Sequence, residues 1–156
     1  SLCIETLEEL NVAGKRGIDI GAGSGILAIA MLRLGAAKAI AFDNDPDAYA
    51  ALRDNRIRNA VADADMPLFI GSVEALRGGT FDVLTMNIIP EVILPLLADV
   101  VTHMSDDARL ILSGILTIKR DEVVAAAATH DLALVSEKSK GEWWAGVFSG
   151  GARASG

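Results

Sequence analysis

Apolar residues follow two different spacings along this chain, and the changes between them divide it into alternating helices and strands. Spacings of three and four predict helices over residues 2–12, 26–35, 46–60, 90–104 and 119–130. Short apolar runs predict strands over 18–20, 38–43, 66–70, 81–87 and 108–116. Residues 132–149 predict two more strands, joined as a hairpin near 138–142.

Glycine, proline and aspartate fall at the predicted boundaries. Gly35 closes the second helix, and Pro46 opens the third helix in its first turn. Asp45 precedes Pro46 and is placed to cap that helix. Segment 71–79, between the third and fourth strands, is predicted to be a loop.

Strands that alternate with helices build a parallel sheet with both faces covered. We therefore expect an α/β, Rossmann-like, doubly wound sheet of seven strands, mostly parallel, with a C-terminal antiparallel hairpin. One domain is expected over residues 1–149, followed by a disordered tail of small and polar residues over 150–156. Ligands bind such sheets outside the carboxyl ends of the strands, where the strand order reverses.

The charge and the cysteine content of the chain indicate which kind of partner it binds and in which cellular compartment it works. The formal charge of −7 argues against a domain that grips nucleic acid by its phosphates, and suits a small molecule or a basic protein. A single cysteine, Cys3, forms no internal disulfide, so we expect a reducing, cytoplasmic location. No apolar stretch is long enough to span a membrane, and no secretory signal opens the sequence. The oligomeric state stays open.

Three glycines in the stretch GIDIGAGSGIL, residues 17–27, mark the first ligand loop. Gly21, Gly23 and Gly25 lie between the first strand and the first crossover helix, where bare backbone can approach a ligand. The dinucleotide fingerprint needs its third glycine at position 26, which is Ile26. Asp19, at the strand end, repels a pyrophosphate and suits a ligand with a cationic group. A plain tight turn is the alternative explanation for the glycines.

A second acidic residue follows at the end of the next strand. Asp43 lies 22 positions after Gly21, where this fold places an acceptor for ribose hydroxyls. The alternative is that Asp43 only helps to form the turn before the third helix. Because Asp45 already serves as the cap, we assign Asp43 to a ligand.

With both acidic residues in place, the sequence resembles class I S-adenosylmethionine-dependent methyltransferases. The stretches DIGAGSGILAIAMLRLGA and AFDNDP carry this resemblance. More narrowly, the chain is similar to the family that methylates ribosomal protein L11, through RDN, FDVLTMNII, LILSGIL and GEWWAGVF. The resemblance implies an enzyme that transfers methyl groups to a lysine or N-terminal amine of a ribosomal protein, with S-adenosylhomocysteine as product and no metal.

The resemblance also implies roles for individual residues. The methionine part of the cofactor is expected along residues 19–25, and the ribose at Asp43 with Asn44 beside it. The adenine is expected against the loop after the third strand. The implied cofactor-binding residues are Asp19, Gly21, Ala22, Gly23, Gly25, Asp43, Asn44, Ser72, Val73 and Asn87. Asn87, at the end of the fourth strand, corresponds to the residue facing the transferable methyl group and is the implied catalytic residue.

The chemistry of amine methylation supports an asparagine at position 87. A lysine amine has a pKa near 10.4 and must lose a proton before its lone pair can attack. The Asn87 carbonyl, together with backbone carbonyls of Ile88 or Ile89, can accept the amine hydrogens without stabilising the ammonium form as a carboxylate does. The alternative role for Asn87 is a cap for the helix that begins at Pro90.

The sequence leaves the substrate open. Family members carry an N-terminal substrate-docking domain, whereas this sequence begins with SLCIETLEEL, so we expect a catalytic-domain fragment or a shortened relative. A methyltransferase acting on a small metabolite or a nucleic acid base, and a non-catalytic cofactor-binding scaffold, remain as alternatives. Of the adjacent residues Trp143 and Trp144, one is expected in the core and one outside, where packing is preferred to a substrate channel as its role.

Overall fold

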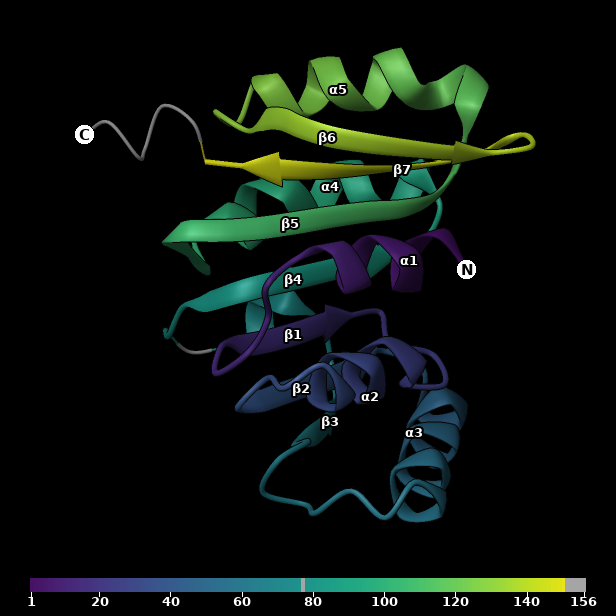
Figure 1. The fold of residues 1–156 in the computed structure, drawn as a ribbon, viewed down its shortest axis with the longest axis vertical. Helices are drawn as coiled ribbons and strands as arrows, with labels where there is room; N and C mark the ends of the chain where they lie inside the picture. The colour runs from purple at the N-terminus through teal and green to yellow at the C-terminus, as the bar shows by residue number, and fades with distance from the viewer. Residues whose placement is uncertain (77, 151–156) are drawn as a thin grey trace.

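The carboxyl ends of the central strands set the position of every candidate residue. The computed structural model describes residues 1–76 and 78–150, which form a twisted sheet between two layers of helices (Figure 1). Of the tail expected at 150–156, residues 151–156 lie outside the described part of the chain.

The elements follow the predicted alternation of helix and strand. In chain order they are α1 (Leu2–Glu9), β1 (Arg16–Ile20), α2 (Ile26–Arg33), β2 (Lys38–Asp43), α3 (Pro46–Arg58), β3 (Leu68–Ile70), a 3-10 turn η1 (Val73–Ala75), β4 (Phe81–Asn87), α4 (Pro90–Val101), β5 (Met104–Leu116), a second 3-10 turn η2 (Thr117–Lys119), α5 (Arg120–Ala128), β6 (Ala133–Lys140) and β7 (Trp143–Ser149). The bounds of β2 and β4 are those predicted. β3 is shorter than expected, β5 begins four residues earlier, and the loop over 71–79 contains η1.

The strand order confirms the expected fold class. The seven strands lie in the order β3-β2-β1-β4-β5-β7-β6. Strands β1 to β5 are parallel, whereas β7 runs antiparallel to both β5 and β6. After β1 the chain first builds β2 and β3 on one side, then returns to build β4 and β5 on the other. The order therefore reverses between β1 and β4, where ligands bind in doubly wound sheets.

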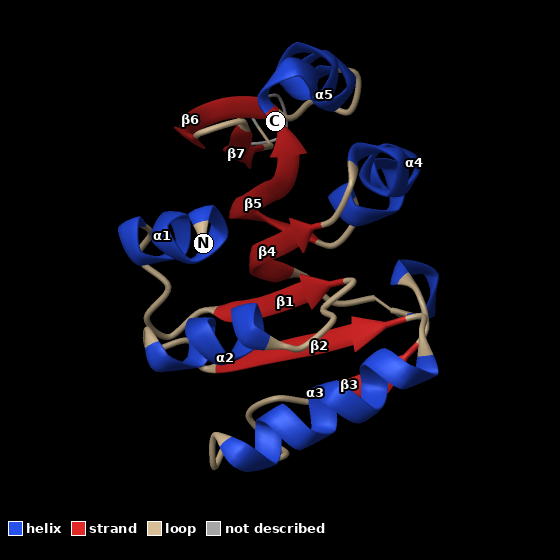
Figure 2. Cartoon of the chain, turned by 90° about the vertical axis from the view of Figure 1, so that its right-hand side faces the viewer, coloured by secondary structure: helices blue, strands red, loops and turns tan. Residues whose placement is uncertain are grey.

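Two apolar cores cover the two faces of the sheet. Helices α4 and α5 pack on one face through buried side chains such as Ile93, Leu97 and Val123. Helices α1, α2 and α3 supply buried side chains such as Leu7, Met31 and Leu52 to the other core (Figure 2). Because successive side chains of a strand point to opposite faces, the faces can be assigned residue by residue.

This alternation places the polar strand residues on one face. In β1, Ile18 and Ile20 belong to the α4/α5 core, so Asp19 between them points toward α1 and α2. In β4, Leu84 and Met86 belong to the same core. Thr85 and Asn87 therefore share the face that carries Asp19. The polar groups of β1 and β4 are thus gathered beneath α1 and α2, at the carboxyl edge.

Gly25 is the tightest point of the glycine loop. It caps α2 with a φ of +80°, and an added Cβ would lie 2.7 Å from Leu52 Cδ2 and 3.0 Å from Met66 Cε. Gly23 also has a positive φ, of +56°, but nothing lies within 4 Å of the same added atom.

Replacing Gly25 with alanine is expected to lower the free energy of unfolding by about 2–4 kcal/mol, because backbone strain and overpacking act together. Replacing Gly23 with alanine incurs the backbone strain alone, about 1 kcal/mol. Urea unfolding of both variants measures the difference. Equal losses would show that Leu52 and Met66 make room without cost.

Candidate active site

Three adjoining pockets open along the carboxyl edge of the sheet. The first, the β2 pocket, has a volume of about 260 Å³ and is lined by Ile20, Gly21, Phe42, Asp43, Asn44, Gly71, Ser72, Val73, Ile88, Val92 and Leu96. The second, the glycine-loop pocket, has a volume of about 370 Å³ and is lined by Ser1, Ile4, Asp19, Gly21, Ala22, Gly23, Ser24, Ile26, Leu27 and Asn87. The third, the β5 pocket, has a volume of about 350 Å³ and is lined by Ser1, Leu2, Asn87, Ser113, Gly114, Lys140 and Trp143.

Shared residues connect the three pockets in series. Gly21 borders both the β2 pocket and the glycine-loop pocket. Asn87 and Ser1 border both the glycine-loop pocket and the β5 pocket. One elongated ligand can therefore occupy the first two pockets, and a second molecule can reach its end through the third. Asn87 stands at that meeting point.

Asp19 supplies a buried carboxyl group to the site. Its side chain is 1% exposed, and Thr85 Oγ1 donates a hydrogen bond of 2.9 Å to its Oδ1. Oδ2 has no hydrogen-bond partner among the described residues. Burial raises the pKa of Asp19 to about 7, the Thr85 hydrogen bond acts against this, and the nearby Asp43 charge adds to it. A buried carboxyl group with a free oxygen beside a pocket is suited to a cationic ligand group.

Asp43 ties the glycine loop to the end of β2. The Gly23 N–H donates to Asp43 Oδ2 at 3.0 Å, and the Asp45 N–H donates to Asp43 Oδ1 at 3.0 Å. The turn that was the alternative explanation is therefore present. A carboxylate offers about four acceptor positions, so Asp43 keeps capacity for a ligand in the β2 pocket.

Asp45 is confirmed as the cap of α3. Its carboxylate accepts a hydrogen bond of 2.9 Å from the Asp47 N–H, at the first turn of the helix. This leaves the neighbouring Asp43 outside the helix, facing the ligand pocket.

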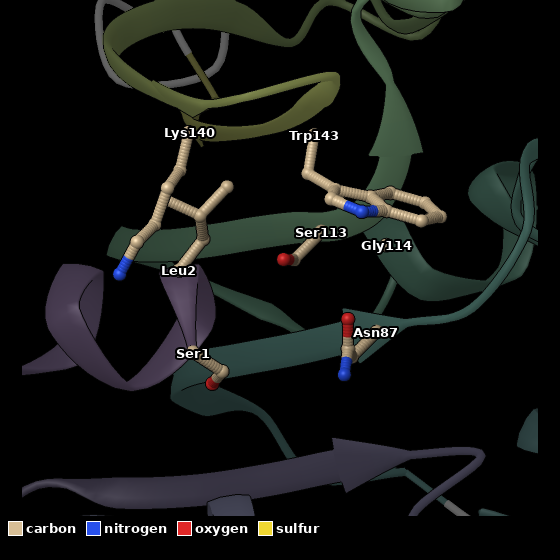
Figure 3. Close-up of a pocket in the computed structure, with 7 residues that line it drawn as sticks. All are labelled: Ser1, Leu2, Asn87, Ser113, Gly114, Lys140 and Trp143. Atoms are coloured by element: carbon tan, nitrogen blue, oxygen red, sulfur yellow. The ribbon is translucent and has the colours of Figure 1, made fainter.

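Asn87 is not a helix cap. The N-cap of α4 is Ile89, without a side-chain hydrogen bond, which rules out the alternative role for Asn87. The side chain is exposed and makes no hydrogen bond to any described residue. Figure 3 shows its amide at the edge of the β5 pocket, below Ser113 and Gly114. The amide is therefore available to a ligand.

The remaining predicted residues gather in the same pockets. Asn44, Ser72 and Val73 line the β2 pocket, where Val73 is buried and the Ser72 hydroxyl donates to Glu74 at 2.9 Å. Ala22 borders the glycine-loop pocket, and its N–H bonds to the Phe42 carbonyl at 2.9 Å. Gly25 does not line either pocket and acts through packing instead.

The β5 pocket contains residues that the sequence did not single out. Ser113 and Gly114 come from β5, and Lys140 from the hairpin. The expected division of the tryptophans is confirmed, since Trp144 is 1% exposed and Trp143 is 47% exposed. Trp143 also lines the β5 pocket. The choice between packing and a channel role for this residue stays a prediction. A glycine inside a predicted strand was the signal for an irregularity at this point.

Neither a metal-binding cluster nor a membrane-spanning helix is found among the described residues. No group of three or more histidine, cysteine, aspartate or glutamate side chains there is arranged to hold a metal ion. No helix over residues 1–76 and 78–150 is long and apolar enough to cross a membrane.

Sequence comparison links this arrangement to one family. The profile of the family described as ribosomal protein L11 methyltransferase (PrmA) matches residues 1–149. A ribosomal protein L11 methyltransferase of Symbiobacterium thermophilum is 37% identical over 143 residues, which cover 92% of this chain and 46% of that relative. The chain spans about half the length of the first curated relatives it matches.

Solved structures agree with the family and with the fold. The ribosomal protein L11 methylase of Lactobacillus delbrueckii subsp. bulgaricus has a TM-score of 0.88 at 29% identity, over 94% of this chain and 75% of that one. The M1A22 tRNA methyltransferase TrmK of B. subtilis has a TM-score of 0.75 at 21% identity, over 97% of this chain and 67% of that one. The second likeness shows the fold alone, so the fold does not select the acceptor.

Because the pKa of Asp19 is raised in the folded chain, its contribution to the free energy of unfolding is expected to fall as the pH rises. Between its usual pKa of 3.8 and about 7, the unfolded chain releases the Asp19 proton while the folded chain keeps it. This group therefore stabilises the fold fully at low pH, and that contribution is lost as pH rises through 7, by up to about 4 kcal/mol.

Replacing Asp19 with asparagine removes this titration and keeps an oxygen for the Thr85 hydrogen bond. We expect the variant to be more stable than the parent chain at pH 8, with the difference shrinking toward pH 5. Urea unfolding at both pH values measures it, and taking the difference cancels the titration of other carboxyl groups. A difference that stays constant with pH would contradict the raised pKa.

Proposed function

Since the chain belongs to the ribosomal protein L11 methyltransferase family, we propose that it transfers methyl groups from S-adenosylmethionine to amine nitrogens of ribosomal protein L11. The observation that carries the proposal is the position of Asn87 between the glycine-loop pocket and the β5 pocket. This position lets one side chain act where a cofactor and an acceptor meet.

The residues of the first two pockets fit S-adenosylmethionine. The unpartnered Asp19 oxygen beside the glycine-loop pocket suits the ammonium group of the methionine part. The free acceptor positions of Asp43 suit the ribose hydroxyls, and Asn44 lies beside it. The apolar side chains of the β2 pocket, among them Val73, Ile88 and Val92, suit the faces of an adenine ring. The Asp19 carboxylate repels a pyrophosphate at this point, and this argues against a dinucleotide as the ligand.

The β5 pocket is suited to hold an amine in its neutral form. None of the described residues that line it carries a carboxylate. Lys140 lines it and is paired with Glu5 of α1, with Nζ 3.5 Å from Glu5 Oε1. Removal from water lowers the pKa of an amine that enters, because it disfavours the ammonium form. When bound, S-adenosylmethionine would supply a methyl group on a cationic sulfur. The lone pair of the amine can attack this methyl carbon, so that the sulfur leaves as the neutral thioether of S-adenosylhomocysteine. Asn87 then accepts an amine N–H and orients that lone pair, so positioning does most of the work.

The acceptor is assigned to a protein amine for two reasons. The family is named for ribosomal protein L11, and the net charge of −7 favours a basic partner over nucleic acid. A ribosomal protein substrate also places the reaction in the cytoplasm. A methyltransferase of metabolites or bases and a non-catalytic scaffold predict different outcomes in the tests below.

Replacing Asp43 with alanine is expected to weaken S-adenosylmethionine binding by about 1.5–3 kcal/mol, as for a lost charged hydrogen bond. This corresponds to a Kd raised roughly 10- to 150-fold in calorimetric titration. The matched control is Asp45→Ala, which removes the neighbouring carboxylate that caps α3. It is expected to keep the Kd and to lose about 1 kcal/mol of stability.

Parallel titrations with S-adenosylhomocysteine and NAD test the cofactor itself. S-adenosylhomocysteine is expected to bind and NAD is not, because the Asp19 carboxylate repels a pyrophosphate and Ile26 occupies the third glycine position of the dinucleotide fingerprint. Binding of NAD alone would contradict the proposed cofactor.

Replacing Asn87 with alanine is expected to slow methyl transfer to ribosomal protein L11 about 10- to 100-fold, as for the loss of one or two positioning hydrogen bonds. The Kd for S-adenosylmethionine is expected to stay within about twofold, because Asp19 and Asp43 supply the charged contacts to the cofactor. Mass spectrometry of L11 in single-turnover reactions measures the rate.

The control for this variant is Asn11→Ala, an amide deletion in an exposed loop before β1. If Asn87→Ala abolished cofactor binding, its role toward the amine would be wrong. If the parent chain bound the cofactor but transferred nothing to L11, the proposed acceptor would be wrong. Methyl transfer to metabolites or nucleic acid bases would then separate a methyltransferase of another substrate class from a non-catalytic scaffold.

A further inference from the structure

A bulge in β5 shapes the β5 pocket. Leu112 pairs with Gly146 and Ile115 pairs with Trp144, so β5 advances three residues where β7 advances two. Leu112 and Ile115 nevertheless both contribute to the α4/α5 core. The two residues between them, Ser113 and Gly114, therefore interrupt the normal alternation of the strand. A bulge of this kind re-aims side chains next to a site.

Gly114 makes the bulge possible and leaves room for Asn87. Its φ is +76°, a conformation that favours glycine. An added Cβ would lie 3.0 Å from Asn87 Oδ1 and 3.4 Å from the Asn87 carbonyl carbon. The absence of a side chain at 114 thus keeps the Asn87 amide in its place at the pocket edge.

Ser113 brings a second neutral polar group to the same point. It is the register partner of Asn87 across β4 and β5, and it is 3% exposed. Its hydroxyl makes no hydrogen bond to any described residue. Figure 3 shows the hydroxyl above Asn87, between the helix that carries Leu2 and the ring of Trp143. A hydroxyl that has no protein partner and that lines a pocket, on a residue that is otherwise buried, is a candidate ligand contact.

We propose that Ser113 is a second hydrogen-bond acceptor for the substrate amine, working beside Asn87. The inference rests on the proposed methyl transfer to an amine. A neutral primary amine has two N–H groups and one lone pair. If Asn87 Oδ1 and Ser113 Oγ each accept one N–H, the lone pair is left to point away from both, toward the glycine-loop pocket.

This arrangement makes the need for Ser113 depend on the methylation state of the amine. A monomethylated amine has one N–H, which either acceptor can take. A dimethylated amine in its neutral form has none, so Ser113 contributes nothing to its orientation. If Ser113 only supported the fold of the pocket, replacing it would slow the transfer of the first, second and third methyl groups equally.

The test compares Ser113→Ala with Ser113→Thr and with Ser136→Ala, which deletes an exposed hydroxyl on β6. Mass spectrometry follows single-turnover methylation of unmodified and of premethylated ribosomal protein L11. Calorimetric titration with S-adenosylhomocysteine checks the cofactor site independently of turnover.

Ser113→Ala is expected to slow the addition of the first methyl group roughly 3- to 10-fold, with less effect on later methyl additions and unchanged S-adenosylhomocysteine affinity. Ser113→Thr, which keeps a hydroxyl, and Ser136→Ala are expected to retain the parental rate of the first addition.

Three results would overturn the inference while leaving the proposed function intact. These are an unchanged first addition in Ser113→Ala, equal slowing of all additions, and a loss of S-adenosylhomocysteine affinity together with the rate. Failure of the parent chain to methylate L11 at all would instead reject the proposed function, and this inference with it.

Discussion

The site depends on one buried carboxyl group, that of Asp19. The parallel register of β1 and β4 brings Thr85 against one of its oxygens, at 2.9 Å, and the other oxygen is left without a partner in the described chain. Leaving a polar atom unsatisfied in a core is costly, so the position favours a function outside the fold. The cost is kept local, because the rest of β1 supplies ordinary core residues such as Ile18 and Ile20.

Asp43 shows how a binding group and a structural group can be the same side chain. Both of its oxygens hold backbone N–H groups, one from the glycine loop and one from the turn before α3. These bonds fix the carboxylate before any ligand arrives, which reduces the entropy lost on binding. They also mean that the loop, the end of β2 and the start of α3 are positioned by one residue, so the two ends of the cofactor site are set together.

Most of the helices and strands could be predicted from the sequence, because apolar spacing and the residues that cap or break helices are local signals. The spacing of apolar residues predicts the elements, and Asp45 and Pro46 predict the start of α3. Asp19 is singled out by its place near a strand end, whereas the role of Asn87 is implied by the family resemblance. The role of Ser113 is not local. It depends on a register shift between β5 and β7 and on pairing with β4, and register follows from packing across the whole sheet. The hydrogen bond from the Gly23 N–H to Asp43 likewise joins residues that are 20 positions apart.

The three pockets divide the site between different parts of the sheet. The β2 pocket and the glycine-loop pocket are lined by the ends of β1 and β2, the loops that follow β1, β2 and β3, and residues of α1, α2 and α4. The β5 pocket is lined by β5, the hairpin, the start of α1 and Asn87 at the end of β4. Of the residues that the structure describes, only Asn87 and Ser1 border both the glycine-loop pocket and the β5 pocket. A substitution or bulge in β5 can therefore alter what enters the third pocket while the residues suited to the cofactor keep their contacts. This separation gives a physical reason why one doubly wound sheet can serve different acceptors, since the acceptor side is free to vary around a fixed cofactor side.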